Sequence, residues 1–392
     1  MKNSIRFRRM RLDCITFNVT LINRRVRKLW SFLCRSFIAI PHRFSPVLSL
    51  IFWLFGVIKN FYFLLKSSFY QLRKSTNKQD RFPLLNLDYV AIREVLNTLD
   101  PIDYINFSKA SKACRRLSTV KKPYKVELRF MNAPMLWFRN GSFCSCMKWI
   151  KSEKPGKFRT RGDPLDAMKK FYLEAKSLMG VEVDFVAIYM DRFGGQCKEV
   201  VDCLRSICQE FSVLRIRGTK QRQEDVQYIL DNLKFKDSLY IVAKTTEELP
   251  LRIPETIDQL SIIHGSWITL DHIMSWEMSR ILVFNDTHLT NQEINIIYKS
   301  WINMESHQNL ECFEINLTNR EDFVAVALRN IPYRMGPTIR ISNYAAVEGS
   351  FEVTRKDGLT ASICVYEFGI GFDAIMFTSP FLSHGKLVRC IP

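Results

Sequence analysis

Short apolar runs alternate with amphipathic stretches throughout the second half of the chain. The apolar runs occupy residues 181–190, 211–218, 238–244, 259–265, 280–286 and 310–317. Between them, residues 223–235 and 289–303 place apolar side chains at helical spacing, and the second stretch opens with Thr290 and Glu293, a capping-box pair. Short strands that alternate with helices predict an α/β fold with parallel strands.

These apolar runs recur at a semi-regular interval. Leu214, Leu239, Leu260, Ile281 and Leu310 follow one another at steps of 25, 21, 21 and 29 residues. The spacing resembles that of an irregular leucine-rich-repeat solenoid. A plain α/β sheet with right-handed crossovers is the alternative that the sequence leaves open.

The C-terminal part, residues 349–377, has a different pattern. Asp357-Gly358 separates two runs of alternating apolar and polar residues, which is a strong hairpin signal. We therefore expect an antiparallel hairpin with a type I′ turn, which needs positive φ at both central residues.

The segment between residues 121 and 180 reads as a linker and helical region in front of the body, 181–392. Residues 121–130 alternate like a strand, and a loop rich in Gly, Pro and Lys follows at 151–164. Residues 163–180 then place Met168, Phe171 and Ala175 on one helical stripe, and Gly180 is a suitable C-cap.

Residues 82–117 predict three short helices after an apolar entry. Asp88 is a candidate N-cap for the first helix, and Asp100-Pro101 ends it and starts the second. The third helix ends in Arg115-Arg116-Leu117. So many apolar side chains on a unit of about forty residues, too short for a large core of its own, indicate that one face docks on a partner.

Residues 1–80 form a basic, apolar extension. They hold sixteen Lys and Arg against two acids, a charge of 16 − 2 = +14, whereas residues 81–392 hold 41 against 37, or +4. Residues 46–65 are apolar enough to span a bilayer, but Lys59 lies within them. A membrane anchor, a targeting segment and a dispensable extension therefore remain three open interpretations.

The rest of the composition argues against catalysis and against specific nucleic-acid binding. The body is close to neutral, and the overall charge of +18 comes mainly from the extension. Eleven cysteines without regular spacing suit a reducing compartment and predict neither a disulfide framework nor a metal site. No serine-hydrolase, zinc-protease or phosphate-loop motif occurs, so we expect no enzyme activity and no cofactor. His264 is expected to end a strand, and Trp267, Trp276 and Trp301 are expected in the core rather than on a recognition surface.

The helical segment at 82–117 resembles an F-box. Leu84 and Leu87, Val95-Leu96, Leu99-Asp100-Pro101, Phe107-Ser108 and Ser111-Lys112 with Arg115-Arg116-Leu117 match its pattern in order. Asp88 stands where F-boxes usually have proline, and Pro83 lies earlier, as in F-box proteins of the nematode type. The resemblance places the F-box at 81–120 and implies that it binds a Skp-type adaptor. The residues implied in adaptor binding are Pro83, Leu84, Leu87, Val90, Val95, Leu96, Leu99, Pro101, Ile105 and Leu117.

The body resembles the F-box-associated domain, type 2. The residues that carry this resemblance are Trp267–Met274, Leu289-Thr290, Glu293–Asn295, Lys299–Ile302, Leu310-Glu311, Arg355–Gly358 and Ala361–Ile363. Together the two resemblances imply a non-catalytic subunit of an SCF-type ubiquitin ligase. It would contact a cullin through the adaptor and select an unknown protein target in the cytoplasm or nucleus. The competing hypothesis is a membrane-anchored interaction protein that faces the cytoplasm and whose F-box-like segment is incidental.

Overall fold

The computed structural model describes residues 88–379, except 120–121, 142, 152–158, 161, 193–195, 248, 338, 341–345, 348 and 369–370. The described residues belong to one compact unit, 85–392. Its helices are α3 (Tyr89–Thr98), α4 (Pro101–Ser108), α5 (Lys112–Leu117), α6 (Pro164–Met179), α7 (Cys197–Ile207), α8 (Gln223–Asn232), α9 (Leu270–Ser275) and α10 (Asn291–Asn303), with a 3-10 turn, η2 (Met190–Arg192), and a π turn, η3 (Phe323–Ala327).

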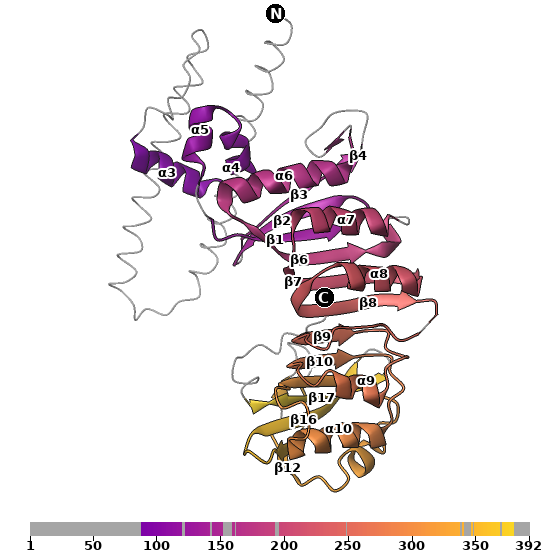
Figure 1. Cartoon of the computed structure of the whole chain (residues 1–392). Coiled ribbons are helices and arrows are strands. Elements are labelled where there is room, and N and C mark those ends of the chain that lie inside the picture. Colours follow the sequence, from indigo (N-terminus) through magenta and orange to yellow (C-terminus); the bar gives the residue numbers. More distant parts are fainter. Residues whose placement is uncertain are drawn as a thin grey trace, which may run out of the picture. The chain divides into compact units, whose positions relative to one another are not determined.

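A large mixed sheet forms the centre of this unit (Figure 1). Its strands are, in spatial order, β12 (Tyr333–Gly336), β15 (Ser350–Thr354), β16 (Thr360–Phe368), β17 (Gly371–Thr378), β11 (Cys312–Leu317), β10 (Ile281–Phe284), β9 (Gln259–Ile262), β8 (Phe235–Thr245), β7 (Phe211–Gln221), β6 (Glu182–Tyr189), β1 (Lys125–Phe130), β2 (Pro134–Asn140) and β3 (Phe143–Lys148). Two short pairs lie outside it: β4 (Ile150–Lys151) with β5 (Arg159–Thr160), and β13 (Ile339–Arg340) with β14 (Ala346–Val347).

The middle of the sheet is parallel. Strands β6 to β11 lie side by side in chain order, and each pairs in parallel with the next. Leu214, Leu239, Leu260 and Leu282 occupy matched register positions and are almost completely buried. The predicted α/β fold is confirmed, and all six apolar runs form strands that pair in parallel with a neighbouring strand.

The N-terminal side of the sheet was only partly anticipated. Strand β1 lies within the predicted alternation at 121–130, but the sequence reading assigned no strands to β2 and β3. These strands form an antiparallel meander with β1, and β1 pairs in parallel with β6. Residues 125–148 therefore belong to the same sheet as the body.

The C-terminal side is antiparallel. β17 pairs with β11, and β16, β15 and β12 continue the sheet outward. The turn between β15 and β16 contains Asp357 and Gly358, but the predicted type I′ geometry is wrong, because only Gly358 has a positive φ, of 90°. The Gly358 amide donates to the Arg355 carbonyl, and the Arg355 amide donates to the Leu359 carbonyl. This pattern fits a three-residue loop that ends in a left-handed glycine.

Local capping signals fix the ends of the helices. The Asp88 side chain accepts from the Ala91 amide, and Asp100 accepts from Ile102 and Asp103 with Pro101 in the first turn. Thr290 and Glu293 form the predicted capping box, and Gly180 ends α6 with a left-handed φ of 64°. Each predicted cap is confirmed, since a cap depends on groups within three or four residues of it.

The N-terminal extension, 1–80, and its candidate span, 46–65, lie outside the described residues. Within residues 88–379, apart from the gaps given above, no helix has both the length and the apolar character needed to cross a membrane.

Candidate interaction sites

Helix α3 presents apolar side chains on its outer surface. Tyr89, Val90 and Val95 are 58%, 68% and 38% exposed, whereas Ile92 and Leu96 of the same helix are buried. The Arg93 guanidinium lies 5.6 Å from the centre of the Tyr89 ring. The helix therefore buries part of its apolar surface in its own unit and leaves three apolar side chains available to a partner.

The structure separates the ten residues that the F-box resemblance implicated. Val90 and Val95 are exposed, and Leu99 and Leu117 are partly buried against the core. Leu96, Pro101 and Ile105 are buried in the helical unit itself, so in this conformation they support the unit rather than offer surface to an adaptor. Pro83, Leu84 and Leu87 lie outside the described residues.

Polar contacts hold the helical unit together and link it to the sheet. Ser145 on β3 donates to the Asp100 carboxylate over 2.9 Å, so one side chain both caps α4 and reaches the sheet. The Tyr104 hydroxyl donates to the Ser118 carbonyl over 2.7 Å, and burial raises the pKa of this phenol. The Lys122 ammonium lies 4.9 Å from the Tyr104 ring centre and donates to Asn97. These contacts hold α3, α4 and α5 as one body on the edge of the sheet.

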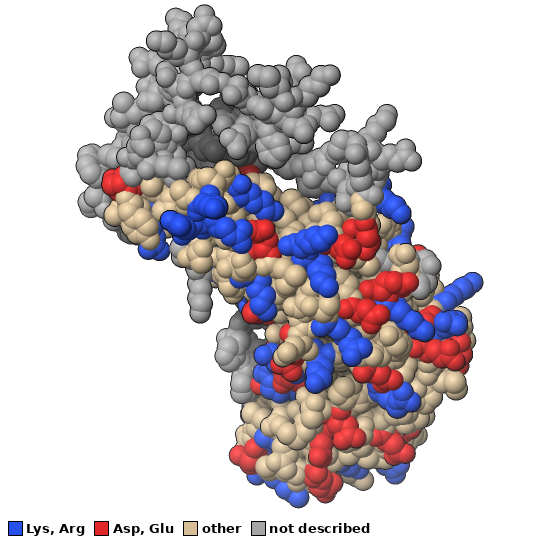
Figure 2. Space-filling view, turned by 45° about the horizontal axis from the view of Figure 1, so that its top comes forward, with Lys and Arg blue, Asp and Glu red and all other residues tan. Residues whose placement is uncertain are grey.

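Charge on the described surface is mostly mixed. Figure 2 shows several basic side chains close together on the upper part of one face, with basic and acidic side chains interspersed below. On α5, Arg115 and Arg116 occupy the last turn, where cations favour the helix dipole, and Arg115 pairs with Glu174 of α6. On the face drawn in Figure 2, the described side chains do not form the continuous basic stripe of a duplex-binding surface.

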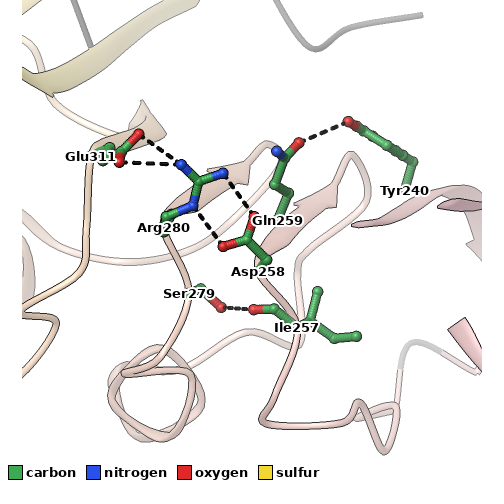
Figure 3. Close-up of polar contacts among 7 residues, drawn as sticks. All are labelled: Tyr240, Ile257, Asp258, Gln259, Ser279, Arg280 and Glu311. Atoms are coloured by element: carbon green, nitrogen blue, oxygen red, sulfur yellow. Dashed lines mark hydrogen bonds and ion pairs between the residues drawn. The ribbon is translucent and has the colours of Figure 1, made fainter. Parts of the chain in front are cut away.

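An arginine ladder joins three parallel strands at their amino ends (Figure 3). Arg280, just before β10, donates to both oxygens of Asp258 over 2.7 and 2.9 Å and to both oxygens of Glu311 over 3.2 Å. Asp258 precedes β9 and Glu311 precedes β11. The Asp258 hydrogen bonds are the largest cause of the raised pKa of Arg280. The guanidinium pairs with a carboxylate on either side, so it links the starts of the three strands.

Next to this ladder, other polar contacts also join neighbouring segments of the sheet. Ser279 donates to the Ile257 carbonyl over 2.6 Å, and Tyr240 reaches Gln259 over 3.4 Å. The sequence reading did not identify Asp258, Arg280 and Glu311. The available signal was a charged residue at the start of each of three successive apolar runs, with alternating sign.

A serine–histidine chain lies in the interior and has no access to substrate. Ser300 contacts Ser306, Ser306 contacts Nδ1 of His307, and His307 Nε2 lies 3.0 Å from the Ile273 carbonyl. Because a carbonyl only accepts, the proton is on Nε2 and Nδ1 accepts from Ser306. His307 is 1% exposed, and burial lowers its pKa. These groups stabilise the packing of α10 and contribute no exposed nucleophile.

The remaining histidine and tryptophan predictions have clear outcomes. His264 contacts the Asp286 carboxylate over 2.8 Å, just beyond the ends of β9 and β10. Trp267, Trp276 and Trp301 are buried, at 8%, 3% and 0% exposure, so their expected place in the core is confirmed.

The cysteines do not form a reactive or metal-binding site in the described part of the chain. Cys197 and Cys203 lie on α7 and Cys208 caps it, and burial raises the pKa of each thiol to about 11. Such thiols stay protonated and are poor nucleophiles. All cysteines among these residues are free, and no group of His, Cys, Asp and Glu there could hold a metal ion.

Comparison with protein families identifies both halves of this arrangement. The F-box domain family matches residues 84–126, which include α3, α4 and α5. The F-box-associated family matches residues 248–315, which include β9, β10, α9, α10 and the arginine ladder. Residues 355–363, part of the sequence resemblance, lie beyond that match. No curated protein and no solved structure matches the chain. The chain therefore carries an F-box domain followed by an F-box-associated domain.

Proposed function

We propose that this protein is the non-catalytic, substrate-recognition subunit of an SCF-type ubiquitin ligase. The F-box binds a Skp-type adaptor and, through it, a cullin, while the body binds a protein target in the cytoplasm or nucleus. The observation that carries the proposal is the exposed apolar surface of α3, formed by Tyr89, Val90 and Val95, in a segment that matches the F-box family.

The architecture of the body supports its role as the target-binding part. Strands β6 to β11 follow one another in spatial order, and a described helix lies between each successive pair except β8 and β9. We infer that this part is repeat-like, in the manner of an irregular leucine-rich-repeat solenoid. Such folds present wide surfaces that recognise proteins.

The adaptor interface is tested by a single substitution on α3. Val90→Glu places a charge on the exposed apolar surface, and an acidic residue in the first turn is compatible with the helix dipole. Loss of an apolar anchor at an interface costs about 2 kcal/mol or more, roughly thirtyfold in affinity. Thermal stability should change little, because Val90 is mostly exposed.

Binding of a purified Skp-type adaptor is measured by calorimetric titration of the full-length protein. Val324→Glu is the matched control, since Val324 is 40% exposed on the π turn η3, away from the F-box. The control should bind the adaptor like the wild type. Equal adaptor affinity for Val90→Glu and the wild type would refute the assignment of α3 as the contact surface.

A further inference from the structure

In the described part of the chain, helices lie on one face of the sheet at β6, β7 and β8, and no described helix lies on the other face (Figure 1). A parallel strand connects to the next through a right-handed crossover, which puts every connecting helix on the same face. Helices α6, α7 and α8 contact one another in sequence along that face (Figure 1). Leu214 and Leu239 point toward these helices and are fully buried. Since side chains alternate along a strand, the intervening residues point to the opposite face, called here the open face.

Arginines and aromatic rings alternate across the open face. In register, Ala187 of β6 lies opposite Arg215 of β7, which lies opposite Tyr240 of β8. The Arg215 guanidinium is 5.1 Å from the ring centres of both Phe185 and Tyr240. One step along, the Arg217 guanidinium is 5.6 Å from the ring centre of Tyr189. The arginines and the aromatic rings are partly exposed, whereas Ala187 is buried.

The positive charge on this face is not balanced. Glu127 on β1 pairs with Arg129 and Arg139, which stack on Trp137. By contrast, no carboxylate of the described residues forms an ion pair with Arg215 or Arg217.

Of the two arginines on the open face, Arg215 is the one more affected by burial. Its Nε is buried without a hydrogen-bond partner among the described residues, and burial lowers the pKa of its guanidinium. A partly desolvated cation without a counter-charge is unfavourable in isolation, and an incoming anion relieves that cost.

The chain's own terminal segments do not supply the missing negative charge. Residues 1–80 hold sixteen basic and two acidic residues, and residues 380–392 hold Lys386 and Arg389 and no acid. A nucleic acid is disfavoured too, because phosphate-backbone binding draws on many cations, whereas residues 81–392 are nearly neutral at 41 − 37 = +4. Arg215 lies between two aromatic rings and Arg217 lies beside one, and neither forms an ion pair with a described residue. This arrangement suits a short acidic peptide that also carries apolar side chains.

We propose that the open face, centred on Arg215 and Arg217 with Phe185, Tyr189 and Tyr240, is the target-binding surface and that it recognises an Asp- and Glu-rich segment of a protein target. This inference rests on the proposed function, since it assigns the part of the body that captures the substrate.

The test uses the full-length protein purified with its Skp-type adaptor. Fluorescence anisotropy measures its affinity for a labelled glutamate-rich peptide with interspersed leucines, for the same peptide with glutamine in place of glutamate, and for oligothymidine. The variants are Arg215→Gln, Arg215→Lys and Arg217→Gln. Arg205→Gln is the matched control, because Arg205 is exposed on α7, on the helical face.

The glutamate-rich peptide should bind the wild type, and each arginine-to-glutamine variant on the open face should weaken it about tenfold or more. The peptide affinity of Arg215→Lys should lie between those of the wild type and Arg215→Gln, since lysine keeps the charge but loses the planar stacking. Arg205→Gln should match the wild type. Melting temperatures identify any variant that fails to fold, and Arg217→Gln decides the outcome if Arg215→Gln is one of them.

Equal affinity of wild type and open-face variants would overturn the proposal, as would equal binding of the glutamine peptide or tighter binding of oligothymidine. Adaptor binding is recorded in the same preparations. Loss of peptide binding with the adaptor still bound refutes the open face alone, whereas peptide binding without adaptor binding refutes the ligase assignment alone.

Discussion

The arginine ladder at the amino ends of β9, β10 and β11 is expected to stabilise the region that matches the F-box-associated family. Arg280→Met removes the guanidinium and keeps most of the aliphatic length. Four charge-assisted N–H···O contacts are lost, two to Asp258 and two to Glu311. The two carboxylates then lie near each other without a counter-charge, so both losses act in the same direction.

The size of the expected stability loss follows from how exposed the three side chains are. The side chains of Arg280, Asp258 and Glu311 are 42%, 35% and 34% exposed, so solvent screens the pairs considerably. A fully exposed pair contributes about 0.2–1 kcal/mol, whereas a bidentate, partly buried pair lies at or above the top of that range. For two such pairs we expect Arg280→Met to lower the free energy of unfolding by about 1–2 kcal/mol.

Urea unfolding followed by tryptophan fluorescence measures this loss, at low salt and at high salt. Because the pairs are partly exposed, added salt should reduce the difference between wild type and Arg280→Met. Arg252→Met is the matched control. The side chains of Arg252 and its partner Asp231 are 78% and 45% exposed, so this ion pair should contribute about 0.5 kcal/mol or less.

A double-mutant cycle with Asp258→Asn then separates the pairwise contribution from the general effect of substitution. Equal stability losses for Arg280→Met and Arg252→Met, or a coupling energy near zero between Arg280 and Asp258, would refute this reasoning.

Two further predictions concern the backbone and the interior. Gly358→Val should lower the free energy of unfolding by about 1–3 kcal/mol in urea, because Gly358 has a φ of 90°, although a Cβ there meets no neighbouring atom. Gly371→Val, equally open but without a positive φ, should cost far less, and a similar cost at both sites would contradict the backbone explanation. His307 has a pKa lowered by burial, so the folded state binds fewer protons than the unfolded state and stability should decrease as the pH falls below the ordinary value of 6.5. In thermal melts, His307→Gln should flatten this dependence while His288→Gln, at an exposed histidine, leaves it; an unchanged slope in His307→Gln would contradict the assignment.

Features that depend on neighbouring residues in the chain could be predicted from the sequence. Asp88, Asp100 with Pro101, Thr290 with Glu293, and Gly180 each act on backbone groups within about one helical turn, so a short window contains all the information. The same holds for the parallel strands, because an apolar run tends to bury its side chains whatever residues lie elsewhere in the chain. The F-box pattern could be recognised for the same reason, because its matching residues lie within one short segment of the chain.

The contacts between distant segments were decided only by the tertiary structure. Helical spacing marks both Val90 and Leu96 as apolar, but only the docking of α3 on the unit determines that Val90 is exposed and Leu96 buried. The turn at Gly358 takes its type from the register between β15 and β16, which two residues alone do not specify.

The two arginine sites show most clearly what the sequence alone does not determine. Arg280 meets Asp258 and Glu311, 22 and 31 residues away, only because three parallel strands begin level with one another. Arg215 stands between Phe185 and Tyr240 only because β6, β7 and β8 align in register. A sequence specifies which residues carry charge and apolar surface, but strand register brings them together, and register is a property of the whole sheet.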